Sequence, residues 1–206
     1  MNSRKLVALT FDDGPNTTTT MQVLDLVEQY GITASFYVVG NNINDESEKS
    51  MQRAVRLGCE IENHSRTHSA MPELTAEEIA AEIKYTSDKI EAATGRKPKF
   101  FRPPYIALND VMFDTIDLTF ICGNGAEDYN DEVSAEERYN RIMEQVTDGM
   151  VILLHDMEGN FRTVDALKLL IPKLLDEGYE FVTTSQLFER AGVTPDHRTI
   201  YTNVYQ

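Results

Sequence analysis

Short apolar runs alternate along this chain with longer stretches in which apolar residues recur at helical spacing. The runs are bounded by glycine, proline and polar residues, which is typical of buried strands. We expect strands at 6–11, 33–39, 59–61, 99–101, 118–122, 150–154 and 179–182. We expect helices at about 20–30, 45–57, 75–94, 109–115, 134–149, 162–177 and 184–190. This alternation favours an α/β fold with parallel strands. About seven strand–helix units in 206 residues predict a barrel smaller or more distorted than the eight-unit one.

Polar side chains that could carry chemistry follow several of these runs. They are Asp12 and Asp13, His64 and His68, Arg102 and Tyr105, Asp128, and His155. In parallel β/α architectures the carboxyl ends of the strands share one face, and active sites are built there. We therefore expect residues more than a hundred positions apart to converge on one cleft.

The first of these clusters sets two adjacent carboxylates, Asp12 and Asp13, in a turn before Gly14-Pro15. A role in the turn alone would explain them. In a cleft, however, the desolvation of ionised carboxylates costs several kcal/mol unless a nearby positive charge offsets it. His64 and His68, half of the four histidines, are spaced by four and would share one face of a helical turn. One aspartate and two histidines make a three-ligand site with an open position, as in catalytic zinc sites. The alternative is two solvated loop histidines.

The charge balance limits the class of partner. Lys and Arg total 19 against 34 Asp and Glu, a net charge of −15, which disfavours nucleic acid and anionic membranes and suits neutral ligands. The sequence has no apolar run of about 18 residues, and its start at 1–5 lacks the core of a signal peptide. We expect a soluble, single domain over 1–206 and a monomer, with Cys59 and Cys122 as free thiols.

Four motifs taken together resemble those of the polysaccharide deacetylases, the NodB-homology family or carbohydrate esterase family four. They are Thr10-Phe11-Asp12-Asp13-Gly14-Pro15, His64-Ser65-Arg66-Thr67-His68, Arg102-Pro103-Pro104-Tyr105 and Leu153-Leu154-His155-Asp156. The resemblance implies a distorted (β/α)7 barrel and hydrolysis of acetyl groups on carbohydrate. It also implies one divalent metal ion, usually zinc, with cobalt or another ion possible, and a secreted or extracellular location.

Matched to these motifs, the metal ligands are Asp13, His64 and His68. The catalytic base is Asp12, and the general acid is His155.

The resemblance also gives supporting roles. Arg102 holds the base, the backbone N–H of Tyr105 helps to form the oxyanion hole, and Pro104 lies in the same substrate-facing turn. Leu154 packs on the acetyl methyl group. The alternatives without a catalytic role are, for Arg102, a surface ion pair at the rim that holds the loop and, for His155 and Asp156, a structural hydrogen-bonded pair.

The family's remaining motif is usually Asp-Trp, and here Asp128-Tyr129 stands in its place in a chain without tryptophan. The resemblance implies that Asp128 tunes the catalytic histidine. Tyr129 is smaller than tryptophan but can still present an aromatic face to a sugar.

The segments 5–9, 99–104 and 178–183 resemble the acetylxylan-esterase branch of the family. Our hypothesis is therefore removal of O-acetyl groups from xylan, with N-deacetylation of chitooligosaccharide or peptidoglycan as the alternative. A two-metal phosphoesterase is a distant alternative. It needs more bridging ligands than we can place, and the negative net charge of the chain would repel a polyanionic substrate. A carbohydrate-binding protein without activity would have lost a residue of these motifs.

Overall fold

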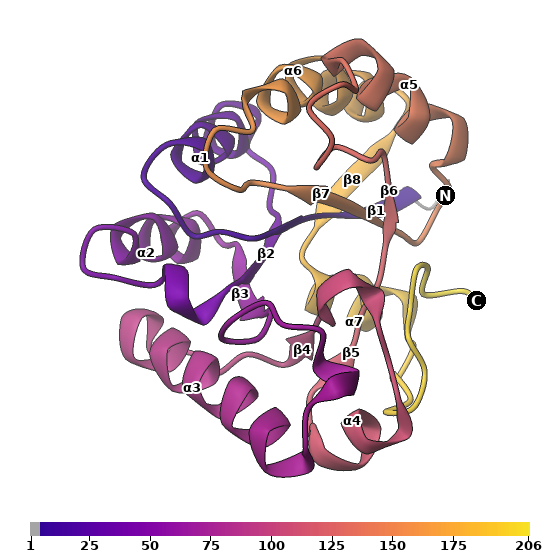
Figure 1. Ribbon diagram of the computed structural model, residues 1–206. Helices are drawn as coiled ribbons and strands as arrows, with labels where there is room; N and C mark the ends of the chain where they lie inside the picture. The colour runs from indigo at the N-terminus through magenta and orange to yellow at the C-terminus, as the bar shows by residue number, and fades with distance from the viewer. Residues whose placement is uncertain (1–4) are drawn as a thin grey trace.

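The strands form one curled parallel sheet with the longer helices around its outside (Figure 1). The computed structural model describes residues 5–206. Its strands are β1 Lys5–Asp12, β2 Ser35–Val38, β3 Glu60–Asn63, β4 Phe100–Phe101, β5 Thr119–Phe120, β6 Asn124–Gly125, β7 Met150–His155 and β8 Tyr179–Val182. Its α-helices are α1 Thr19–Tyr30, α2 Glu48–Arg56, α3 Ala76–Thr94, α4 Asp110–Thr115, α5 Ala135–Gln145, α6 Phe161–Asp176 and α7 Thr184–Ala191. Short 3₁₀ turns lie at Gly40–Asn42, Met71–Glu73 and Pro104–Ile106.

The sheet runs in the order β5-β4-β3-β2-β1-β7-β6, and β8 pairs with the first half of β1. Only three residues separate β5 from β6, yet β5 pairs with β4 and β6 pairs with β7. The two short strands therefore act as one broken strand that joins the ends of the sheet. This arrangement confirms the expected distorted (β/α)7 barrel.

The period-two alternation of strand side chains decides which residues enter the barrel. In β1, Val7, Leu9 and Phe11 join the core beneath the helices. The intervening Leu6 and Ala8 join a second core inside the barrel. Continued along the strand, the same alternation carries Asp12 inward at the carboxyl end.

Several expected elements form with different limits. The stretch 123–131, between the strand expected at 118–122 and the helix expected at 134–149, contains β6, for which we expected no strand. The helix expected at 134–149 ends at Gln145. At the start of this helix a capping box of Ser134 and Glu137 is half formed, because Ser134 accepts a hydrogen bond from the Glu137 N–H while the Glu137 carboxylate pairs with Arg141. The box at Thr75 and Glu78 is complete.

The tail after α7 closes one end of the barrel. Tyr201 forms a bridge with Ile121, Asn203 forms one with Met150, and both Tyr201 and Val204 are buried. We expected the start of the sequence at 1–5 to lack the core of a signal peptide, and residues 1–4 of this segment lie outside the described residues. Within 5–206, none of the helices combines the length and hydropathy needed to span a bilayer.

Candidate functional site

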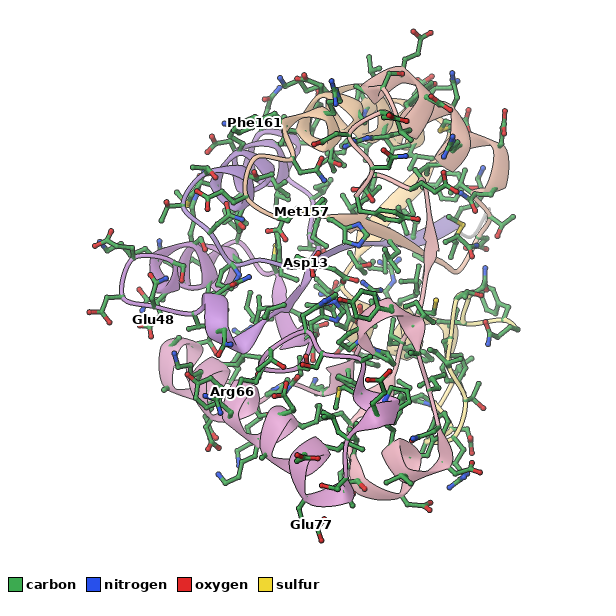
Figure 2. All side chains as sticks on the ribbon, viewed as in Figure 1. Asp13, Glu48, Arg66, Glu77, Met157 and Phe161 are labelled. Atoms are coloured by element: carbon green, nitrogen blue, oxygen red, sulfur yellow. The ribbon has the colours of Figure 1, made fainter. Side chains whose placement is uncertain are left out.

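Asp13, His64 and His68 bring one ligand atom each to a common point at the carboxyl ends of the strands. These atoms all lie within 4.8 Å of one another. Asp13 Oδ1 is 3.5 Å from Nε2 of His64 and 3.4 Å from Nε2 of His68. Figure 2 shows Asp13 near the middle of the viewed face, with Met157 close by and Glu77 at the rim.

The hydrogen bonds of His64 leave the correct nitrogen available for a metal ion. Its Nδ1 lies 2.6 Å from the carbonyl oxygen of Arg102, and a carbonyl only accepts, so Nδ1 carries the hydrogen and Nε2 keeps its lone pair. Burial lowers the pKa of His64 although Asp12 and Asp13 act to raise it, which favours the neutral imidazole. Two imidazoles and one carboxylate fit a divalent ion with an open coordination position.

The two histidines are not brought together by a helical turn, as their spacing suggested. Residues 64–68 form a loop in which Ser65 and His68 have φ of 65° and 59°. The Asn63 side chain accepts from the Ser65 N–H, and the Ser65 hydroxyl accepts from the His68 N–H. The Glu82 carboxylate of α3 accepts from two further N–H groups of the loop. Local hydrogen bonding therefore replaces helical geometry.

Asp12 lies beside this cluster and is held by a buried arginine. Arg102 Nη1 donates to Asp12 Oδ1 at 2.6 Å, and Nη2 donates to the Thr10 hydroxyl and the carbonyl of Cys122. The guanidinium lies 4.1 Å from the ring centre of Tyr37 and is fully buried, so it is no surface ion pair. Burial opposes the charge of Asp12, but Arg102, with His64 and His155, offsets this and lowers the pKa of Asp12.

A second acid–base pair lies across the site. His155, at the end of β7, donates from Nδ1 to Asp128 Oδ1 at 2.8 Å, and its backbone N–H donates to Asp128 Oδ2 at 2.8 Å. Burial lowers the pKa of His155, but the hydrogen bond and charge of Asp128 outweigh it and raise that pKa to about 9. The imidazolium form is thus present at neutral pH. Tyr129 meets the His155 ring edge-on at 5.7 Å.

Asp156 does not pair with the imidazole of His155. It is fully buried, and its carboxylate accepts from the Thr20 hydroxyl at 2.5 Å. Burial raises the pKa of Asp156 to about 7 although this hydrogen bond acts to lower it. The alternative of a hydrogen-bonded His155–Asp156 pair is therefore wrong, because Asp156 bonds to Thr20 in α1 and His155 bonds to Asp128.

These groups surround a pocket of about 690 Å³. Its lining includes Asp12, Asp13, His64, His68, Pro103, Tyr105, Ile106, Gly125, Glu127, Tyr129, Leu153 and His155.

Two expected pocket residues are displaced by one position. Leu153 lines the pocket, whereas Leu154 is buried in the core beneath the helices, because neighbours in β7 point to opposite faces. Likewise Pro103 lines the pocket, and Pro104 is a buried residue at the start of the following turn. The alternation of side chains along 150–155 could have indicated Leu153 from the sequence, because residues two apart in a strand share one face.

Tyr105 lies in an uncommon backbone conformation at the pocket edge. Its φ is 58°, and that of Ile106 is 53°. The next two N–H groups bond back to the carbonyls of Pro103 and Pro104, whereas the Tyr105 N–H has no hydrogen-bond partner among the described residues. The Tyr105 ring meets His68 edge-on at 4.7 Å and is 70% exposed. The turn thus places at the pocket edge a residue with an unpartnered backbone N–H and an aromatic side chain.

Comparison with known proteins agrees with this geometry. The family described as polysaccharide deacetylase matches residues 1–119. A bifunctional xylanase/deacetylase of Pseudobutyrivibrio xylanivorans is 45% identical over 203 residues, covering 98% of this chain and 34% of that protein. The chain therefore spans about a third of the length of this curated relative.

Two solved structures match over almost their whole length. The Xyl-CE4 domain of a multidomain xylanase from the hindgut metagenome of Trinervitermes trinervoides has a TM-score of 0.96 and 45% identity, covering 98% of this chain and 99% of that one. A family 4 acetyl xylan esterase from Clostridium thermocellum, in complex with a cobalt ion, has a TM-score of 0.95 and 40% identity, covering 98% and 100%. That cobalt ion and the three-residue cluster here support a divalent metal site.

Proposed function

The chain belongs to the polysaccharide deacetylase family, and from that premise we propose that it removes O-acetyl groups from xylan by metal-dependent hydrolysis. The observation that carries this proposal is the convergence on one pocket of a three-ligand cluster, a carboxylate of Asp12 held by Arg102 and an imidazole of His155 held by Asp128. A nucleophile, a base and an acid around one ester are what acyl transfer to water requires.

The metal site is proposed to hold zinc through Asp13, His64 and His68. When bound, the ion would polarise the ester carbonyl and make water a better nucleophile near neutral pH. The described residues contain one such donor cluster, which supports a single ion and opposes a two-metal phosphoesterase.

The residues of the chain divide the proton transfers between them. Asp12 takes a proton as the water oxygen bonds to the carbonyl carbon, and Arg102 keeps that carboxylate charged beforehand. The Tyr105 N–H can donate to the oxyanion that develops, a kind of stabilisation worth roughly 3 to 4 kcal/mol. His155 then protonates the sugar oxygen as its bond to the acetyl carbon breaks. Acetate and a free hydroxyl are the products.

The pocket supports a neutral sugar as substrate. Exposed rings of Tyr105 and Tyr129 stand at its edge, and Leu153 offers an apolar contact for the acetyl methyl group. The net charge of −15 suits an uncharged polymer. Similarity to a xylanase/deacetylase and to an acetyl xylan esterase favours xylan. Because such a polymer does not cross membranes, we place the activity outside the cell. We propose further that residues 1–206 act as one domain and as a monomer.

The deciding measurement is acetate release from acetylated xylan, before chelation, after chelation and after zinc is returned. We expect release that chelation abolishes and zinc restores. Oligomers of N-acetylglucosamine serve as the parallel substrate. Release from these alone would replace the xylan proposal by N-deacetylation, and no release from either substrate would overturn the function.

Two substitutions separate the proposed base from the proposed ligand. Asp12→Asn should retain one metal ion per chain while turnover falls by at least about a hundredfold, since a general base contributes roughly 10²–10⁴. Asp13→Asn should lose both the metal and turnover. Metal content by elemental analysis and acetate release check this. Equal metal loss in both variants would contradict the division of roles.

A further inference from the structure

A buried arginine stands behind the Asp128–His155 pair and does not touch the pocket. Arg138 of α5 is fully buried and is one of the two largest side chains with that status. Its Nε donates to the carbonyl of Val133, and its Nη2 donates to the carbonyl of Asn130. Its Nη1 donates to Asn160 Oδ1 at 2.6 Å and to the Thr163 hydroxyl at 2.8 Å.

The two side chains that Arg138 contacts both reach Asp128. The Thr163 hydroxyl lies 2.7 Å from Asp128 Oδ2, and Asn160 Nδ2 lies 3.5 Å from the same oxygen. Thr163 is fully buried, Asn160 is 3% exposed and Asp128 is 1% exposed. The contacts therefore form one buried chain from the guanidinium to the carboxylate.

The chemistry of the guanidinium fixes the direction of every hydrogen bond in this chain. Arginine has donors only, so the Thr163 oxygen must accept from it. The single hydroxyl hydrogen of Thr163 is then left for Asp128. By the same argument Asn160 turns its oxygen towards Arg138 and its NH₂ towards Asp128 Oδ2 and the carbonyl of His155.

Asp128 gains from this a fixed orientation. Its Oδ2 receives the Thr163 hydroxyl and the backbone N–H of His155, while Oδ1 stays on the imidazole Nδ1. A buried carboxylate without such donors pays a desolvation cost and favours its protonated form. A protonated or rotated Asp128 would not hold His155 in the tautomer and position of a general acid.

We propose that Arg138 and Thr163, with Asn160, are positioning residues for the reaction, because they orient donors towards Asp128 and so fix the imidazole of His155. This proposal rests on the proposed function, since it assigns His155 as the acid. Neither Arg138 nor Thr163 lines the pocket, so their effect belongs to kcat and not to KM.

The test compares two replacements of Thr163. Thr163→Val keeps the shape and loses the hydroxyl, and we expect kcat to fall about tenfold with KM unchanged, the size expected when one hydrogen bond to a charged group is lost. Thr163→Ser keeps the hydroxyl but leaves a small cavity, and we expect it to retain most of kcat. A packing role predicts the opposite order, so Val equal to or better than Ser would overturn the proposal.

A matched control is Thr86→Val, which changes another fully buried helical threonine whose hydroxyl bonds to a carbonyl of its own helix. Its kcat should stay at the wild-type value. Arg138→Met should lower kcat more than Thr163→Val does, whereas Arg138→Lys, which keeps the charge, should recover part of the loss. Equal kcat for Arg138→Met and the wild type would contradict the proposal.

A second readout does not depend on activity. In ¹⁵N-histidine-labelled protein the His155 Nδ1–H should give a protected NMR resonance, because it bonds to a buried carboxylate. We expect this resonance in the wild type and in Thr163→Ser, and its loss by solvent exchange in Thr163→Val. If the wild type releases no acetate but the resonance follows this order, the proposed function fails and the positioning network stands. A resonance retained in every variant would overturn the network.

Discussion

Arg102 and Arg138 are buried cations, and each supports one half of the candidate site. Arg102 contacts the carboxylate of Asp12 directly, whereas Arg138 acts on Asp128 through neutral side chains. A buried charge is tolerated only where partners replace its water, and removal of one partner costs about 3–5 kcal/mol. The ring of Tyr37 provides part of this replacement for Arg102, whose Nε has no hydrogen-bond partner. The two arginines thus keep a base ionised and an acid oriented in one small volume.

Asp128→Asn tests what raises the pKa of His155. That pKa, about 9, depends on the Asp128 hydrogen bond and charge, and burial alone would lower it below the ordinary 6.5. His155 acts as an acid only when protonated, so activity is lost as the pH rises through this pKa. We expect the alkaline limb of kcat/KM at or below about pH 9 in the wild type and at a clearly lower pH in the variant, where only the charges of Asp12 and Asp13 still oppose the effect of burial.

The control for that profile is Asp131→Asn, which changes an exposed carboxylate on the same loop. Its alkaline limb should coincide with that of the wild type. An unchanged limb in Asp128→Asn would mean that another group provides the proton.

Asp156→Asn tests the cost of a buried carboxyl group. The folded-state pKa of Asp156, about 7, lies above the ordinary 3.8, so between these values the unfolded chain releases a proton that the folded protein keeps. Wild-type stability should therefore fall as the pH rises from about 4 to 7. The amide variant lacks this term and should be more stable than the wild type by about 2–4 kcal/mol at pH 8. Urea unfolding at pH 5 and pH 8 measures the difference, and a gap that does not widen with pH would refute the assignment.

At the scale of elements, the break between β5 and β6 shapes the pocket. Gly123 lies in this break, and a Cβ at this position would be 2.8 Å from the Cβ of Leu153 and 3.1 Å from the carbonyl oxygen of Val151. The close approach lets β6 pair with β7 while Leu153 faces the pocket. A side chain at 123 would separate these two strands.

We therefore expect Gly123→Ala to destabilise the protein by about 1–3 kcal/mol, the usual cost of overpacking, and to lower kcat as Leu153 moves. Thermal unfolding and acetate release measure the two effects. Gly95→Ala is the control, because it changes a helix-capping glycine with open space around it. It should cost about 1 kcal/mol through its positive φ and leave kcat unchanged. Loss of stability in Gly123→Ala without loss of kcat would contradict the link to the pocket.

Elements with strong local signals were predicted well from the sequence. Helix α3, expected at about 75–94, forms at Ala76–Thr94 between a capping box at Thr75 and a C-cap at Gly95. Strand β6 was missed because its two residues gain their pairing only from distant β7, which no local pattern records. Loop 64–68 was read as a helical turn because a spacing of four fits both, and tertiary hydrogen bonds decide between them. Arg138 was missed because a helical arginine is ordinarily a surface residue.

For the whole molecule, the metal ligands join parts of the chain that are far apart in sequence. Asp13 follows β1, and His64 and His68 follow β3, with two strand–helix connections between them. A bound ion would therefore link the ends of β1 and β3, which lie on either side of β2 in the middle of the sheet. A ligand that binds only the folded chain stabilises it, by about 2.7 kcal/mol at a free concentration of one hundred times Kd.

For a chain of this size, that free energy corresponds to a rise in Tm of roughly 5–10 °C when zinc is added to the chelated protein. Asp13→Asn should show no rise, because it lacks one ligand. Asp12→Asn should keep the rise, because Asp12 lies outside the three-residue ligand cluster and its Oδ1 accepts from Arg102. Calorimetry of the three proteins with and without zinc measures these shifts. An equal rise in wild type and Asp13→Asn would mean that the ion stabilises the fold from another site. A rise lost in Asp12→Asn would instead make both carboxylates ligands and remove the base from the proposed mechanism.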